Sequence, residues 1–285
     1  MLIRKAKLYS ELVRFEHTLF ALPFALVGVL LASDGFPPLK KLFWIILAFV
    51  GARTGAMSFN RWVDVEIDAL NPRTSRRPIQ RGEVKRWEAL FLSVLSYSLL
   101  ILSAYMLGPL CFKLSFIAVF ILSVYSYTKR FTSLSHFILG LCLSASPLGA
   151  WIAIRNTFDK GIIILSLGVL FWVAGFDIIY SLQDVEFDRR MGLFSIPVKL
   201  GIRLSILLSR ICHALFILSL VYVSHYFSLG LLFKLGIFLV FLFLSYEHSL
   251  VKENDLSRIN TAFFTVNASI SVFLFFVTLA DKIVG

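Results

Sequence analysis

The sequence has 285 residues, of which 58% are hydrophobic and only 16% are charged. A soluble domain is usually about half apolar and about a quarter charged, so this composition indicates an integral membrane protein. The net charge of +11 would suit a nucleic-acid-binding protein, but the Lys and Arg residues cluster between apolar runs, as they do in membrane proteins. We therefore expect the lipid bilayer, and not nucleic acid, as a partner.

Nine apolar runs are long enough, or nearly so, to cross the hydrocarbon layer of a bilayer, which is about 30 Å thick. In chain order these predicted helices cover residues 16–33, 41–60, 88–107, 109–127, 134–154, 161–182, 204–226, 229–246 and 261–280. The pairs of runs that meet at Gly108-Pro109 and at Ser228 are also compatible with single longer helices, which leaves the count open by one or two. We expect an all-α integral membrane protein in which residues 1–285 form a single membrane-embedded domain.

The distribution of Lys and Arg predicts the orientation of these helices. With a cytoplasmic N-terminus, the inner segments hold most of the basic residues, above all the loop 61–86, whereas the outer segments hold few, such as Lys40 and Lys160. Such a bias is typical of cytoplasmic loops. The sequence thus predicts a multi-pass protein of a bacterial inner membrane, with its N-terminus inside the cell.

Two similar acidic motifs close the second and the sixth predicted helix. Their polar members are Asn60, Asp64 and Asp68 in the first motif and Asp177, Asp184 and Asp188 in the second. Residues four or seven apart lie on one face of an α-helix, so each motif should form a single stripe. Because the second and the sixth helix run in the same direction, both motifs fall at the cytoplasmic face. This arrangement predicts two parallel halves that face each other across a central cavity.

Carboxylates close to a bilayer are energetically costly and by default mark a functional site. Oxygen ligands of this kind suit Mg²⁺, which usually binds one or two carboxylates together with phosphate oxygens of a substrate. We therefore predict that the two stripes hold Mg²⁺ ions with a diphosphate between them. The residues predicted to be catalytic are Asp64, Asp68, Asp184 and Asp188, and the predicted metal ligands are these four together with Asn60 and Asp177. The alternative is that the acids are helix-end charges paired with arginines, namely Arg61, Arg73, Arg189 or Arg190.

Basic residues crowd the same face of the predicted bundle. Arg73 and Arg77 lie in the loop 61–86, and Lys129 and Arg130 follow the fourth helix. Such side chains are natural donors to phosphate oxygens, although basic loops also serve as topology signals or as contacts to anionic lipid.

Arg53 differs from these residues because it lies inside the second predicted helix. It precedes Asn60 by seven residues and therefore shares its helical face. An arginine that faces a cavity within a membrane calls for an anion, such as a substrate carboxylate or an internal aspartate.

The remaining chemistry-bearing residues form no pattern of a site. The five histidines are scattered without metal-ligand spacing and are interpreted as structural or interfacial: His17, His136, His213, His225 and His248. The three cysteines lie far apart inside apolar runs and are interpreted as packing residues: Cys111, Cys142 and Cys212. A few of the 29 Phe residues are expected to line the cavity, where their ring faces would stabilise a carbocation.

The order of these motifs resembles that of the UbiA superfamily of membrane aromatic prenyltransferases, over nearly the full length of the chain. The resemblance is carried by Asn60-x-x-x-Asp64-x-x-x-Asp68 and the following Asn71-Pro-Arg-Thr-Ser-Arg-Arg-Pro, by Tyr127-Thr-Lys-Arg-Phe, and by Asp177-Ile-Ile-Tyr-x-x-x-Asp184-x-x-x-Asp188. Within the superfamily the chain is similar to the 4-hydroxybenzoate polyprenyltransferases. Two segments are similar to sequences of the branch associated with menaquinone made through futalosine, namely Gly149-Ala-Trp-Ile-Ala and Val173-Ala-Gly-Phe-Asp.

The resemblance implies a bundle of nine membrane helices around a cavity and assigns roles to single positions. It implies metal or diphosphate contacts for the six polar members of the two motifs. It further implies diphosphate contacts for Lys129, Arg130, Arg73 and Arg77, and contacts to an aromatic acid for Arg53 and Tyr180. The chain departs from many relatives in two places, where Arg61 replaces an Asp and where Arg190-Met-Gly-Leu-Phe-Ser replaces Lys-x-Gly-x-Lys-Ser.

The resemblance implies the Mg²⁺-dependent transfer of a polyprenyl group from polyprenyl diphosphate to 4-hydroxybenzoate in ubiquinone or menaquinone biosynthesis. The alternative acceptor is 1,4-dihydroxy-6-naphthoate of the futalosine route, and no obligate protein partner is expected. A membrane phosphatidyltransferase would need an Asp-Gly-x-x-Ala-Arg block, which the sequence lacks. A membrane transporter is a further alternative, although its acids would be expected at mid-membrane and not at the helix ends.

Overall fold

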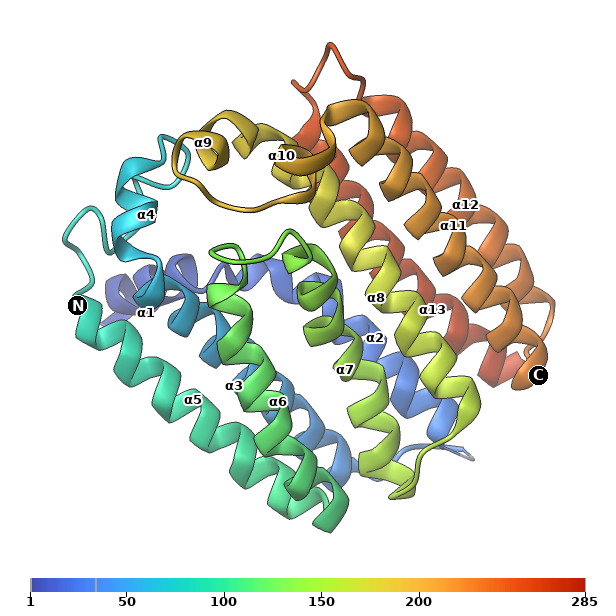
Figure 1. Ribbon diagram of the computed structural model, residues 1–285. Helices are drawn as coiled ribbons and strands as arrows, with labels where there is room; N and C mark the ends of the chain where they lie inside the picture. Colours follow the sequence, from blue (N-terminus) through green and yellow to red (C-terminus); the bar gives the residue numbers. More distant parts are fainter. Residues whose placement is uncertain (1, 34, 285) are drawn as a thin grey trace. The chain divides into compact units, whose positions relative to one another are not determined.

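The structure is a computed structural model that describes residues 2–33 and 35–284. Its long helices are α2 (Thr18–Ala32), α3 (Leu39–Val63), α5 (Arg86–Leu107), α6 (Pro109–Thr128), α7 (Ser135–Arg155), α8 (Lys160–Ser181), α11 (Ile202–Tyr226), α12 (Leu231–Leu250) and α13 (Asn267–Val284) (Figure 1). The short helices are α1 (Leu2–Leu12), α4 (Val65–Leu70), α9 (Val185–Arg190) and α10 (Ile196–Leu200), with 3-10 turns at Phe15–His17 and Leu182–Asp184 and a π-helix at Thr261–Val266. The described residues form no β-strand.

Nine helical segments of this described chain are long and apolar enough to cross a membrane, which confirms the predicted all-α membrane class and the predicted number of spans. The two doubtful breaks are real. Gly108 separates α5 from α6 with φ 132°, a backbone conformation that glycine adopts without the steric cost of a Cβ atom. Ser228 lies between α11 and α12 with φ 52°, so these helices are also separate.

The chain divides into two compact units. The first unit comprises residues 1–18 and 43–127, and the second comprises residues 19–42 and 128–285. The prediction of a single membrane-embedded domain stays a prediction.

In the first unit, α3 and α5 approach closely because glycines on α3 face α5 (Figure 1). A Cβ atom at Gly51 would lie 2.7 Å from the Ser96 carbonyl oxygen, and one at Gly55 would meet the Tyr97 ring. The Ser93 hydroxyl also donates to the Gly55 carbonyl oxygen at 3.0 Å. Small residues and hydroxyl contacts of this kind are the usual means of packing membrane helices, and here they fix the helix that carries the first acidic motif.

In the second unit, α8 is the buried central helix, flanked by α7 and α11 (Figure 1). A Cβ atom at Gly140 of α7 would lie 2.4 Å from the Leu170 carbonyl oxygen of α8, whereas nothing lies within 4 Å of one at Gly149. On the opposite face, the Ser209 hydroxyl of α11 donates to the Gly175 carbonyl oxygen at 2.8 Å. Helix α8, which carries the second acidic motif, thus has its backbone in close contact with α7 on one side and with α11 on the other.

Helices α12 and α13 are joined by polar contacts inside the same unit. The Asn267 amide donates to the carbonyl oxygens of Ala262 and Phe263, at 3.0 and 3.2 Å, within the π-helix that precedes α13. It also donates to the buried Glu247 carboxylate of α12 at 3.1 Å. Near the other end, Asp281 accepts hydrogen bonds from the first backbone N–H groups of α12, at Gly230 and Phe233.

Candidate functional site

The first acidic motif lies at a break between two helices. Helix α3 ends at Val63, Asp64 has φ −97° and ψ 16°, and α4 begins at Val65. Asp64 thus separates two helices, and the two further acids in the first turn of α4 suit the positive end of a helix dipole. Backbone hydrogen bonds from Asp64 to Asn60 (3.0 Å) and from Asp68 to Asp64 (2.7 Å) keep the four-residue spacing across the break.

The side chains of the first motif form a connected polar network. The Asn60 amide donates to Asp64 Oδ2 at 2.9 Å, and Arg61 Nη1 donates to Asn60 Oδ1 at 3.2 Å. Arg61 Nη1 also lies 3.9 Å from Asp68 Oδ2, and the same oxygen accepts from Arg77. Arg61 and Asp68 are both buried. Removal of a guanidinium group from this buried carboxylate would destabilise the protein, because an unpaired buried charge is costly.

The loop after α4 positions Arg77. The Asn71 carboxamide oxygen accepts from the Arg73 N–H group at 2.9 Å, which forms a local turn, and the Thr74 hydroxyl donates to the Asp68 carbonyl oxygen at 2.9 Å. Arg73 is exposed and Arg77 is half-buried. Arg77, one of the two predicted diphosphate ligands of this loop, thus engages an acid of the motif.

Arg53, predicted to bind the aromatic acid, is engaged with the end of α1. Its Nη2 atom donates to the Arg14 carbonyl oxygen at 2.8 Å and to the Val13 carbonyl oxygen at 3.4 Å, and its Nε atom donates to the Thr18 hydroxyl at 3.3 Å. These carbonyl groups follow α1, so Arg53 fastens the segment after α1 to α3. Its contact to a substrate stays a prediction.

The second motif repeats the geometry of the first. Helix α8 ends at Ser181, a single 3-10 turn covers Leu182–Asp184, and α9 begins at Val185. Asp184 has φ −102° and ψ 1°, close to the values at Asp64, and acids again occupy the first turn of the short helix. Here too the middle aspartate directly precedes a six-residue helix.

Asp177 has a partner that the sequence did not indicate. The His136 Nδ1 atom lies 2.7 Å from Asp177 Oδ2, and His136 Nε2 lies 3.4 Å from the Ile196 nitrogen. Because the Ile196 N–H group can only donate, Nε2 accepts and Nδ1 carries the proton that is donated to Asp177. The fully buried His136 therefore fixes the orientation of Asp177. No local sequence signal links residues 41 positions apart.

Asp188 has the most telling environment of the six predicted ligands. Its side chain is 2% exposed, and no hydrogen-bond partner of Oδ2 is found among the described residues. The Ser195 hydroxyl donates to this carboxylate, which lies within electrostatic range of Lys129, Asp184 and His136. A buried carboxylate oxygen without a donor calls for a proton or a cation. The donor set therefore fits a divalent metal ion with hard oxygen ligands.

The other predicted residues of this unit surround the motif. The Phe194 N–H group donates to the Lys129 carbonyl oxygen at 2.7 Å, which holds the loop after α9 against the half-buried Lys129, whereas Arg130 is exposed. Tyr180 stacks on Phe263 with ring centroids 4.0 Å apart, and Phe263 also contacts Phe176. Tyr180 thus belongs to an aromatic cluster at the end of α8.

Neither unit builds a complete metal site from its own side chains. Within each unit, the described residues contain no group of three or more His, Cys, Asp or Glu side chains placed to hold a metal ion. A metal ion bound by one motif would therefore need further oxygens, such as those of a phosphorylated substrate.

Comparison with known proteins decides the family. The sequence profile of the UbiA prenyltransferase family matches residues 21–276, which is most of the chain. The chain belongs to the UbiA prenyltransferase family. It is thus a prenyltransferase and a multi-pass integral membrane protein, as the resemblance implied, and the transporter and phosphatidyltransferase alternatives are set aside.

Relatives within the UbiA family are similar over most of their length. The chain is 32% identical over 228 residues to a 4-hydroxybenzoate octaprenyltransferase of Vesicomyosocius okutanii, covering 80% of this chain and 83% of the relative. It is 34% identical over 203 residues to the enzyme of the same name from Vibrio cholerae, covering 69% and 70%.

Solved UbiA structures share the fold. The apo structure of a homologue from Aeropyrum pernix K1 has a TM-score of 0.84 and 31% identity, covering 93% of this chain and 98% of that one. A homologue from Archaeoglobus fulgidus, solved with GPP and Mg²⁺, has a TM-score of 0.77 and 21% identity, covering 96% and 99%.

Proposed function

We propose that this UbiA-family prenyltransferase transfers a polyprenyl group from polyprenyl diphosphate to 4-hydroxybenzoate, with Mg²⁺, in quinone biosynthesis. The similar proteins named 4-hydroxybenzoate octaprenyltransferase support the acceptor, and the Archaeoglobus homologue solved with GPP and Mg²⁺ supports the donor and the metal. The observation within this chain that carries the proposal is the buried Asp188 carboxylate, whose Oδ2 atom has no donor among the described residues.

Each motif would bind metal and diphosphate oxygens. Asp64 together with Asn60, and Asp184 together with Asp188, supply carboxylate and carboxamide oxygens at the starts of α4 and α9. The arginine contacts of Asp68 and the His136 contact of Asp177 fall on Oδ2, which leaves Oδ1 of each residue for a metal. Bound Mg²⁺ would neutralise charge on the diphosphate and so favour its departure.

The protein's own residues would carry the remaining steps. The allylic C–O bond breaks, and its electrons leave with the diphosphate. The diphosphate oxygens would accept hydrogen bonds from Lys129, Arg130, Arg73 and Arg77. The aromatic cluster around Tyr180 would shield the allylic cation from water and stabilise it through ring faces. The acceptor then attacks through the carbon ortho to its hydroxyl group and loses a proton.

The acceptor is the part of the proposal with an alternative. Both 4-hydroxybenzoate and 1,4-dihydroxy-6-naphthoate present a hydroxylated ring with a carboxylate, to which Arg53 would donate. The names of the relatives favour 4-hydroxybenzoate, whereas the motifs at Trp151 and Gly175 favour the naphthoate.

We also propose that the N-terminus and both acidic motifs lie on the cytoplasmic side of a bacterial inner membrane. The concentration of Lys and Arg in the segments on that side supports this orientation. Polyprenyl diphosphate and the aromatic acid would then reach the enzyme from the cytoplasmic leaflet and the cytoplasm.

An assay of membranes that contain the protein tests this function. The membranes are incubated with octaprenyl diphosphate and either acceptor, with Mg²⁺ or with EDTA, and the prenylated product is quantified. We expect Mg²⁺-dependent prenylation of 4-hydroxybenzoate. If only 1,4-dihydroxy-6-naphthoate is prenylated, the acceptor is the naphthoate and not 4-hydroxybenzoate. If neither acid is prenylated, the proposal is overturned.

A further inference from the structure

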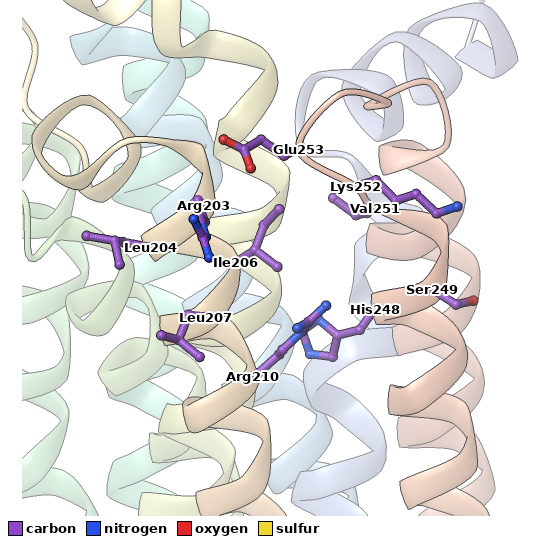
Figure 2. A pocket seen from close by; sticks show the side chains of 10 residues that line it. All are labelled: Arg203, Leu204, Ile206, Leu207, Arg210, His248, Ser249, Val251, Lys252 and Glu253. Atoms are coloured by element: carbon purple, nitrogen blue, oxygen red, sulfur yellow. The ribbon is translucent and has the colours of Figure 1, made fainter.

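A groove in the second unit lies between α11 and α12, outside the acidic motifs. It has a volume of about 1050 Å³, and Figure 2 shows its lining residues, which come from the first two turns of α11, the end of α12 and the loop that follows. The charged residues of this lining are Arg203, Arg210, Lys252 and Glu253. None of these residues has a role in the proposed prenyl transfer.

The groove carries an excess of positive charge. The lining holds three cations, Arg203, Arg210 and Lys252, and one carboxylate, Glu253. Within the described chain, no acid lies within salt-bridge distance of any of the three cations. All three are exposed, so they are available to a ligand. Unpaired cations on a membrane helix are costly unless an anion accompanies them.

Arg210 is the most informative of these cations. It lies seven residues beyond Arg203 on the same face of α11, or about 10 Å further along the helix axis at the rise of an α-helix. Its neighbours Leu207 and Ile211 are exposed apolar residues of a helix that spans the membrane. An arginine so placed suits an anion at the level of lipid head groups.

The groove continues as an apolar furrow. A second hollow of about 420 Å³ shares Arg210, His248 and Ser249 with the first and is lined further along by Ala214, Ile217, Phe241 and Leu244. A basic mouth that opens into an apolar furrow matches an amphiphile with an anionic head and a hydrocarbon chain. A soluble phosphate compound would make no use of the furrow.

We propose that this groove binds one anionic glycerophospholipid of the surrounding bilayer. Its phosphodiester lies between Arg203 and Arg210, and one acyl chain occupies the furrow between α11 and α12. The exposed Glu253 at the rim disfavours a head group with several negative charges, such as a diphosphate, and favours a singly charged phosphodiester. The lipid then contacts both helices at this end.

Titration of the delipidated, detergent-solubilised full-length protein with dioleoylphosphatidylglycerol tests the proposal, with bound lipid counted by native mass spectrometry. We expect one tightly bound lipid and affinity about 30-fold weaker in the double variant Arg203→Gln/Arg210→Gln, since each cation near an anionic head group contributes roughly fivefold. The control Lys113→Gln/Lys234→Gln removes the same charge from exposed positions outside the groove and should bind as the unchanged protein does. Equal binding by both double variants would overturn the proposal.

Three further measurements separate the lipid from other ligands. Arg203→Lys/Arg210→Lys keeps the charge and should keep most of the affinity, which guards against a variant that fails to fold. Ala214→Trp fills the furrow and should weaken binding of the two-chain lipid at least tenfold. If glycerophosphoglycerol or inorganic diphosphate competes as well as the lipid, or if farnesyl diphosphate binds more tightly than the lipid through the same arginines, the groove is not a phospholipid site.

Discussion

Asp188 is the residue on which the proposed chemistry depends most directly. Replacing it by Asn keeps the size of the side chain and removes the charge that a buried, donor-free oxygen offers to a metal. We expect Asp188→Asn to lower the rate of prenyl transfer about 100-fold, or about 2.7 kcal/mol of transition-state stabilisation, and to raise the Mg²⁺ concentration needed for activity. Product formation as a function of Mg²⁺ concentration measures both effects.

The control for this prediction is two residues away. Glu186 lies on the same short helix but is exposed, so Glu186→Gln should retain the Mg²⁺ dependence and the rate. A near-normal rate in Asp188→Asn would remove this residue from the metal site.

His136 is predicted to act by positioning Asp177. His136→Leu leaves Asp177 Oδ2 and the Ile196 N–H group without their shared partner, which should cost about 1–3 kcal/mol of stability. His136→Asn retains a donor for Asp177 and should restore part of this loss. Thermal unfolding in detergent measures the stability, and a shift of the Mg²⁺ activation curve in His136→Leu separates positioning from a purely structural role. An unfolding midpoint and an activation curve both equal to those of the unchanged protein would contradict this assignment.

Candidate site residues could be selected from the sequence only where a local pattern exists. The spacing of Asp64 and Asp68, and of Asp184 and Asp188, identified the acids because four-residue intervals are visible in the sequence. The contact between His136 and Asp177 joins two helices and has no such interval. Likewise, the engagement of Arg53 with the end of α1 depends on where that short helix ends, which the sequence did not reveal.

At the level of helices, the recurring feature is a long membrane helix that breaks at an aspartate and continues as a six-residue helix. An Asp followed by two acids favours a helix start, but the four-residue spacing from which the stripes were predicted does not reveal a break. The same local geometry occurs at Asp64 and at Asp184. It is a structural repeat, of which the sequence showed only the similar order of residues.

The packing of α7 on α8 yields a prediction with an internal control. A Cβ atom at Gly140 would come within 2.4 Å of the Leu170 backbone oxygen, so Gly140→Ala must push the helices apart and should cost about 1–3 kcal/mol. Gly149 lies on the same helix with nothing within 4 Å of its Cβ position, so Gly149→Ala should be neutral or slightly stabilising. Unfolding midpoints of the two variants in detergent measure the difference, and equal midpoints would show that this close approach does not limit stability.

For the molecule as a whole, the predicted orientation can be measured by labelling. In a variant without its native cysteines, a cysteine at the exposed Ser257 should react with a membrane-impermeant maleimide only after the cytoplasmic side is made accessible. A cysteine at the exposed Thr157 should react from the outside in intact cells. The reverse pattern would place the N-terminus and both acidic motifs outside, and would contradict the proposed cytoplasmic active site.

The membrane architecture was the most predictable part of the protein. A helix must be about 20 residues long and largely apolar to satisfy its backbone in lipid, and this constraint appears directly in the sequence. The predicted breaks at Gly108 and Ser228 were confirmed. Both residues have a positive φ, which interrupts the helical backbone between the two helices that meet there. The polar contacts that fix the helices against one another were not predictable, because they join residues distant in the chain.

The π-helix before α13 has a consequence for the far end of that helix. One surplus residue in a helical turn rotates everything downstream by about 100° relative to an uninterrupted α-helix. Asp281 therefore owes its alignment with the amide groups of Gly230 and Phe233 to an irregularity some four turns earlier, which the Asn267 side chain holds in place. Shortening the chain by one residue between Thr261 and Val266 would swing that carboxylate out of register and uncap α12, so this small insertion governs how the C-terminal hairpin is closed.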